Sequence, residues 1–295
     1  MNSSRPAFPA RFVWLLGLAA VVVVAGCGPS AQKATGPAGE YAEATGMFKQ
    51  GNFDRALDLS EKLAEASPPN AYTERAQVLR LVIFGGRVKA YKELADAYAA
   101  GADKAEKTNF KTEFQRVRSD SLQYAAKAAL GLAETAHLMM AGKGIGKEVV
   151  LEAPYPDVEG PTEVTQLDKV KKGEWIEAAE QESASLDARH KGMDDELAEA
   201  LAASRSKARS ELTAGPVEIN GLDFSIFLTK ELLNAATAFD HDHYNDIRKL
   251  KLVAQEADQA AQAALDMLKE NPDKDKEKAV KKLQADIKEA IKKNS

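Results

Sequence analysis

The chain has 295 residues, of which 44% are hydrophobic and 29% are charged, with 40 lysines and arginines against 45 aspartates and glutamates. This balance is too apolar for a disordered protein, and the mild negative charge argues against a nucleic-acid partner. A single cysteine excludes an internal disulfide and any multi-cysteine zinc or iron–sulfur site. We therefore expect a folded protein with one large core or two modest ones.

The first 26 residues carry the pattern of an export signal. A basic start with Arg5 and Arg11 is followed by an uncharged and almost entirely apolar stretch over residues 12–25. This stretch is too short for a membrane-spanning helix, which needs about 20 apolar residues. Residues 1–26 are therefore predicted to be a cleaved signal peptide.

The cysteine that follows has the surroundings of a lipid attachment site. Val24-Ala25-Gly26-Cys27 resembles the lipobox of bacterial lipoproteins, in which a hydrophobic residue and two small ones precede the cysteine. The resemblance implies that Cys27 is diacylated and anchors the chain in a membrane, since two acyl chains hold stably. An ordinary secretory signal with an incidental Cys27 is the alternative. Gly28, in place of the Asp of inner-membrane lipoproteins, implies the periplasmic face of the outer membrane if the host is diderm.

Residues 27–39 are predicted to be a flexible tether that holds the folded part off the lipid. They are small and polar and include two prolines. Cleavage would remove Arg5 and Arg11 and no acidic residue, which makes the net charge of −5 more negative by two units. Charge alone should therefore not draw the protein to an anionic bilayer.

From residue 40 onward the chain is predicted to be all-α. Apolar residues recur at three- and four-residue spacing in stretches rich in Ala, Leu, Glu, Lys and Gln, with almost no strand-like alternation. Two short apolar runs, 148–152 and 216–220, are predicted as strands that could pair. The predicted helices span residues 40–50, 53–66, 71–84, 87–99, 104–140, 162–171, 174–190, 194–213, 223–240, 244–270 and 275–293.

The segment from Met47 to Leu57 resembles a tetratricopeptide repeat, in which two antiparallel helices meet at a tight turn. The resemblance assigns the turn to Gly51, an aromatic plug to Phe53 and a close helix contact to Ala56. Pro68 then ends the second helix.

Weaker matches to the repeat follow, as expected because a single repeat cannot bury its apolar face alone. Gly85 and Ala90 fall on the turn glycine and the contact alanine at a spacing of 34 residues. Gly173, Trp175 and Ala178 repeat the turn, plug and contact positions. These weaker repeats predict an irregular tetratricopeptide-like α-solenoid of antiparallel helix pairs. The alternative is an unrelated helical bundle in which one hairpin imitates the motif.

The predicted domains follow from this register. Residues 40–103 hold the tetratricopeptide-like repeats, and residues 104–272 form a repeat-like helical region with a Gly/Pro-rich insertion at 141–161. Residues 273–295 form a Lys-rich amphipathic helix with an apolar stripe opposite its lysines. This helix is predicted to cap the solenoid. The alternative is an arm that contacts phospholipid headgroups or an acidic partner.

The sequence contains few residues in patterns that could catalyse a reaction or bind a metal or a phosphate. His241 and His243 form the one clustered pair of potential metal ligands, but histidines two residues apart do not share a helix face, and a solvated turn explains them better. The glycines of residues 141–147 miss the phosphate-loop pattern, and no G-x-S-x-G turn occurs. We therefore expect no enzymatic activity, no cofactor and no metal.

The expected function is that of a membrane-anchored helical-repeat lipoprotein that binds or scaffolds an envelope protein or peptide. Its layout is similar to that of the lipoprotein subunit of the outer-membrane β-barrel assembly machine. The alternative is an envelope lipoprotein that binds a small ligand or a metal through the His241/His243 turn.

Overall fold

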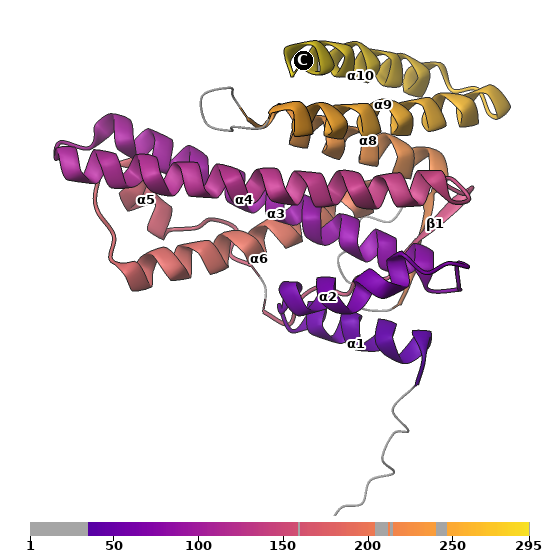
Figure 1. Cartoon of the computed structure of the whole chain (residues 1–295), viewed down its shortest axis with the longest axis horizontal. Helices are drawn as coiled ribbons and strands as arrows, with labels where there is room; N and C mark the ends of the chain where they lie inside the picture. Colours follow the sequence, from indigo (N-terminus) through magenta and orange to yellow (C-terminus); the bar gives the residue numbers. More distant parts are fainter. Residues whose placement is uncertain (1–34, 159, 204–211, 213–214, 240–246, 295) are drawn as a thin grey trace, which may run out of the picture. The chain divides into compact units, whose positions relative to one another are not determined.

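The computed structural model describes residues 35–158, 160–203, 212, 215–239 and 247–294. Over these residues the structure is mostly helical with little strand, which confirms the all-α class (Figure 1). The elements in chain order are α1 (Pro37–Lys49), α2 (Phe53–Ala64), α3 (Thr73–Lys104), α4 (Thr108–Ala141), β1 (Glu148–Leu151), α5 (Gln166–Lys171), α6 (Ala178–Ala202), β2 (Val217–Asn220), α8 (Gly221–Thr237), α9 (Ile247–Glu270) and α10 (Lys274–Lys293).

Polar side chains at the helix starts explain several of these boundaries. The side chains of Asn52, Asn220 and Asp273 accept hydrogen bonds from backbone N–H groups in the first turns of α2, α8 and α10. α6 begins with a capping box between Glu177 and Glu180. These contacts satisfy N–H groups that have no partner within the helix.

Two helix breaks predicted from the sequence are absent. α3 runs without interruption through Gly85, so the predicted division into helices 71–84 and 87–99 is wrong. α6 likewise runs through Gly192 and joins the predicted helix 174–190 to the start of the next. The reason is packing, because the glycines let the two helices approach closely where they cross.

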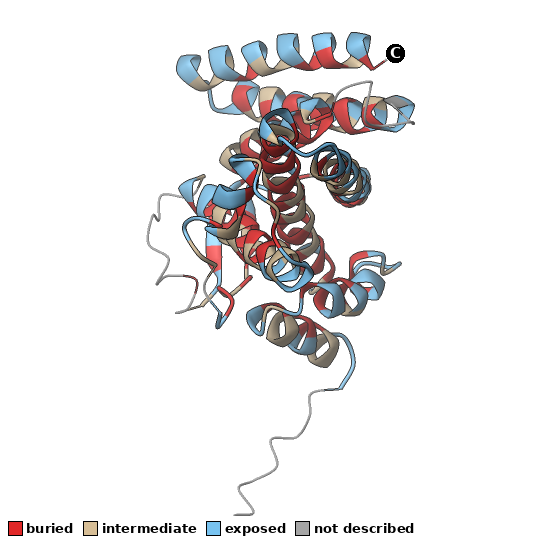
Figure 2. Cartoon of the chain, turned by 90° about the vertical axis from the view of Figure 1, so that its left-hand side faces the viewer, coloured by how far each residue is buried: buried red, intermediate tan, exposed pale blue. Residues whose placement is uncertain are grey.

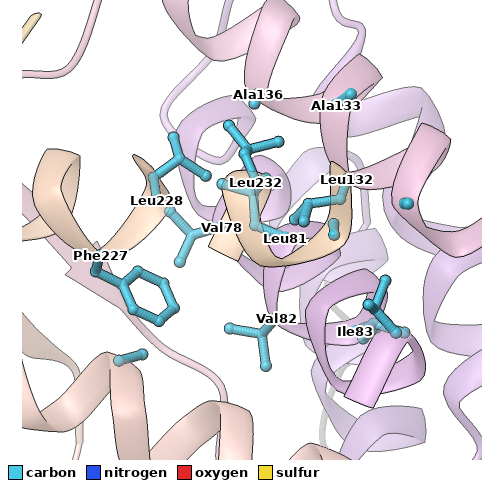
Figure 3. Close-up of a cluster of buried hydrophobic side chains, with 14 of the residues drawn as sticks. Val78, Leu81, Val82, Ile83, Leu132, Ala133, Ala136, Phe227, Leu228 and Leu232 are labelled. Atoms are coloured by element: carbon cyan, nitrogen blue, oxygen red, sulfur yellow. The ribbon is translucent and has the colours of Figure 1, made fainter. Parts of the chain in front are cut away.

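The largest hydrophobic cluster surrounds α3, which packs against α4, α6 and α8. Figure 3 shows part of it, where aliphatic side chains of α3, α4 and α8 converge. Val78, Leu81, Leu132, Leu228 and Leu232 are each at most 2% exposed. Burying one such side chain stabilises the fold by about 1.5–3 kcal/mol.

The two strands that the sequence predicts are present and pair antiparallel. Glu148 lies opposite Asn220, and Leu151 lies opposite Val217. Val149 and Ile219, which face each other across the ladder, are fully buried. The β1–β2 pair therefore packs its buried side chains against α3 and α8.

α10 is docked on α8 and α9 by its apolar stripe, and its outward side is exposed (Figure 2). Val280, Ile287 and Ala290 are buried beneath it. At its end, the side-chain amide of Asn294 donates a hydrogen bond to the carbonyl of Ala236 at 3.2 Å. The stripe is thus used for packing within the protein.

Candidate functional site

The turn between α1 and α2, where the sequence predicts a tetratricopeptide-like hairpin, docks on α6. Gly51 has φ +75°, a left-handed conformation that favours glycine, and a Cβ there would overlap the ring of His190. Phe53 is 4% exposed, and its ring centroid lies 5.3 Å from that of His190. Ala56 is fully buried. The plug of the motif therefore joins the first helix pair to a helix far along the chain.

Charged side chains strengthen the same junction. Asp54 accepts a hydrogen bond from Arg87 of α3, and its carboxylate lies 3.9 Å from Arg189 of α6. Burial lowers the pKa of His190, which keeps its ring neutral at pH 7. The turn thus lies within ion-pair distance of Arg189.

The predicted second repeat, with Gly85 and Ala90, lies inside α3. Gly85 and Ala90 are helical, so the predicted turn at Gly85 is wrong, while Pro68 lies in the loop between α2 and α3. The real role of this segment is the crossing with α6. A Cβ on Gly192 would overlap the carbonyl oxygen of Gly86 and lie 3.1 Å from the Cβ of Ala90. Small residues therefore bring the two backbones into contact.

The predicted third repeat, with Gly173, Trp175 and Ala178, is a helix–turn–helix that packs differently from the α1–α2 hairpin. Gly173 has φ +85° in the turn between α5 and α6. The ring of Trp175 stacks on Phe110 and Phe114 at centroid distances of 5.5 and 5.9 Å. Ala178 is exposed, so the close helix contact predicted there is wrong. The reason is that α6 starts at this residue and meets α3 only further along.

A buried ionic cluster joins α3, α6 and α8 next to the crossing. The ammonium of Lys89 donates hydrogen bonds to Glu196, to Glu231 at 2.6 Å and to Glu199 at 3.2 Å. The side chains of Glu196 and Glu231 are 1% and 5% exposed, whereas that of Glu199 is 51% exposed. A Cβ on Gly85 would overlap the Glu196 carboxyl, so the absence of a side chain there makes room for the cluster.

Three carboxyls around one cation leave an excess of negative charge in the interior. Burial raises the pKa of Glu196 and, with the charge of Glu196, raises that of Glu231 to about 7. Burial alone would lower the pKa of Lys89, but the adjacent carboxylates raise it. The pKa of Glu231 thus lies near neutrality, while Lys89 keeps its charge. The cluster therefore holds a proton near neutral pH.

On the first half of α6 the helix forms one wall of a surface groove, which we call the tyrosine groove. Its volume is about 530 Å³, and its other walls are α3 and α4. It is lined by Tyr91, Leu94, Tyr98, Val117, Asp120, Ser121, Tyr124, Ala178, Gln181, Glu182, Ser185 and Arg189.

Three tyrosines line part of the tyrosine groove. The rings of Tyr91 and Tyr124 stack with a centroid distance of 5.3 Å and an interplanar angle of 28°. Tyr124 is 57% exposed, which is unusual for a large aromatic side chain. Tyr98 is 2% exposed, and burial raises its pKa to about 12, so its hydroxyl remains protonated. The groove therefore offers aromatic faces and hydroxyl donors together.

Charges lie on two walls of the groove. Asp120 of α4 pairs with Arg116 at 3.1 Å, and Glu182 of α6 is exposed. Arg189 of α6 contributes a positive charge, and its guanidinium lies 3.9 Å from the carboxylate of Asp54. The turn between α1 and α2 therefore lies next to one wall of the groove.

Several predicted features lie outside the described residues: Cys27, the signal peptide, His241 and His243. In the described part of the chain, no group of three or more His, Cys, Asp or Glu side chains is arranged to hold a metal ion. None of the described helices is long and apolar enough to cross a membrane. The chain matches no protein-family model, no curated protein and no solved structure.

The sequence pattern did not single out the residues of the cluster or of the groove. A signal for the cluster exists, because Glu231 and Glu196 occupy core-facing positions beside Leu232 and Leu197 in amphipathic helices. A charge at such a position indicates a buried partner. No comparable signal marks Tyr91 and Tyr124, which come from different helices.

Proposed function

We propose that the protein is a membrane-anchored lipoprotein that binds another envelope protein through the tyrosine groove and has no catalytic activity. The observation that supports this most is the exposed Tyr124, stacked on Tyr91 at the mouth of a groove. Exposed aromatic side chains in a concave surface are typical of binding sites, because they supply contact area at low entropic cost.

The proposal combines this groove with the anchor predicted at Cys27. A lipid tether confines the protein to a thin layer at the membrane, which raises its effective concentration towards partners there. In this proposal α1 and α2 form a single tetratricopeptide-like hairpin, which supports the groove through Asp54 and Arg189. The groove, with its three helical walls, accepts an extended segment of the partner.

Photocrosslinking in intact cells tests the binding. A photoreactive phenylalanine analogue replaces Tyr124, and in a matched control it replaces Leu252 of α9, since the two side chains are 57% and 55% exposed. We expect a defined adduct with an envelope protein from position 124 only, and its loss when Tyr91→Ala is added. The absence of any adduct at position 124, or the same adduct from both positions, would overturn the proposal.

Metabolic labelling with a fatty-acid analogue tests the anchor separately. The wild-type protein should incorporate the label, and the Cys27→Ser variant should not, because acylation requires the thiol. Equal labelling of the two proteins, or no label in either, would contradict lipidation at Cys27.

A further inference from the structure

We propose that the tyrosine groove binds a proline-rich segment in the polyproline II conformation that carries a basic residue. This inference rests on the proposed function and narrows it to one class of partner. It follows from the aromatic, hydroxyl and charged side chains on the three walls of the groove, and from the absence of a strand edge and of a continuous apolar surface among its lining residues.

Helical walls exclude one common mode of peptide recognition. The groove is lined by residues of α3, α4 and α6, and none of these walls is a strand. An extended peptide that adds a strand needs an open sheet edge, and the groove has none among its lining residues. Recognition must therefore come from side chains.

The apolar content of the groove also disfavours an amphipathic helix as the ligand. Such a helix places several apolar anchors into a continuous hydrophobic surface. Here the aliphatic lining consists of Leu94, Val117 and Ala178, of which Leu94 is only 5% exposed. The remaining lining residues are tyrosines and polar groups.

Tyrosines and hydroxyls match a polyproline II segment. Proline rings pack on aromatic faces, and the partly exposed Tyr91 and the exposed Tyr124 present aromatic rings from α3 and α4. Proline has no N–H, so a proline-rich segment offers carbonyl acceptors and few donors. The groove supplies donors through the hydroxyls of Tyr91, Tyr124 and Ser185, which are at least partly exposed.

Carboxylates on facing helices provide the preference for a basic residue. Glu182 lies on α6 and Asp120 on α4, and both line the groove. Glu182 is exposed, so a lysine or arginine of the ligand can reach it. Arg189 adds an opposite charge further along α6, which gives the bound segment a direction.

Fluorescence anisotropy with the purified full-length protein tests the inference. The probe is a labelled peptide of repeated proline and alanine with one central arginine. Two control peptides replace each proline by glycine or the arginine by glutamate. We expect both control peptides to bind more weakly than the probe.

Variants then assign the binding to the groove. Tyr124→Ala should weaken binding of the probe by about tenfold, and Tyr124→Phe should weaken it less. Glu182→Gln should weaken binding of the arginine peptide by about two- to fivefold. Leu252→Ala, at a residue of similar exposure on α9, should leave the affinity unchanged.

Three results would overturn the inference: no binding of the proline peptide, equal binding of the glycine peptide, or unchanged affinity in Tyr124→Ala. A crosslinked partner segment without proline at position 124 would do the same and leave the proposed protein-binding function in place. Absence of a crosslink at that position would instead remove the proposed function itself.

Discussion

Replacing Glu231 by glutamine should change how the stability of the protein depends on pH. Burial and the charge of Glu196 raise the pKa of Glu231 from 4.5 to about 7. Between these values the folded protein binds more protons at this site than the unfolded chain does. The free energy of unfolding therefore falls as the pH rises through this range.

The size of the effect follows from the shift. One pKa unit corresponds to about 1.4 kcal/mol, so the wild-type protein should lose about 3 kcal/mol of stability through this group. Glutamine does not titrate, and its carbonyl can still accept the hydrogen bond from Lys89. Relative to wild type, the Glu231→Gln variant should therefore gain about 3 kcal/mol between about pH 4.5 and about pH 8.

Urea denaturation at a series of pH values, followed by far-UV circular dichroism, measures this difference. Glu199→Gln is the matched control, since Glu199 contacts the same lysine but its side chain is 51% exposed. Its effect should be clearly smaller, because water screens its charge. Parallel stability curves for wild type and Glu231→Gln would refute the reasoning that buried carboxyls share one proton.

Three further predictions concern packing and the groove. Gly192→Ala should destabilise the protein by about 2 kcal/mol or more in urea denaturation, because the added Cβ would overlap Gly86. The control Gly46→Ala has open space around it and should stabilise the protein by about 1 kcal/mol. Equal effects of the two substitutions would contradict the close crossing of α3 and α6. Phe53→Ala should cost about 3–5 kcal/mol in the same assay, and a loss below about 1 kcal/mol would show that Phe53 is not a plug. Glu231→Gln should leave the affinity of the arginine peptide within about twofold of wild type, because the close crossing at Gly192 lies between the cluster and the groove; a larger change in anisotropy titrations would couple the cluster to the groove.

The helical class and the two strands could be predicted from the sequence, because both depend on the local periodicity of apolar residues. The runs at 148–152 and 216–220 alternate or concentrate Val, Ile and Leu, and they pair as β1 and β2. The interpretation of glycine failed for a physical reason. Gly51 and Gly85 look alike in the sequence, but Gly51 has φ +75° in a turn and Gly85 lies within α3.

What separates these glycines is their tertiary surroundings. Gly85 faces Glu196, and Gly86 faces Gly192, residues that lie on another helix about a hundred positions later. A glycine inside a helix costs about 1 kcal/mol, and only a close crossing offsets that cost. The tyrosine groove escaped prediction for the same reason, since Tyr91 and Tyr124 meet only once α3 and α4 have packed.

The crossing also separates the buried cluster from the groove, although both use α3 and α6. Lys89 and Tyr91 are two positions apart on α3 and therefore point to different sides of that helix. On α6, Gly192 lies between Arg189 of the groove and Glu196 of the cluster. The backbones touch at Gly192, between these two residues of α6. We therefore expect a change of charge among the carboxyls of the cluster to leave the binding surface of the groove unchanged.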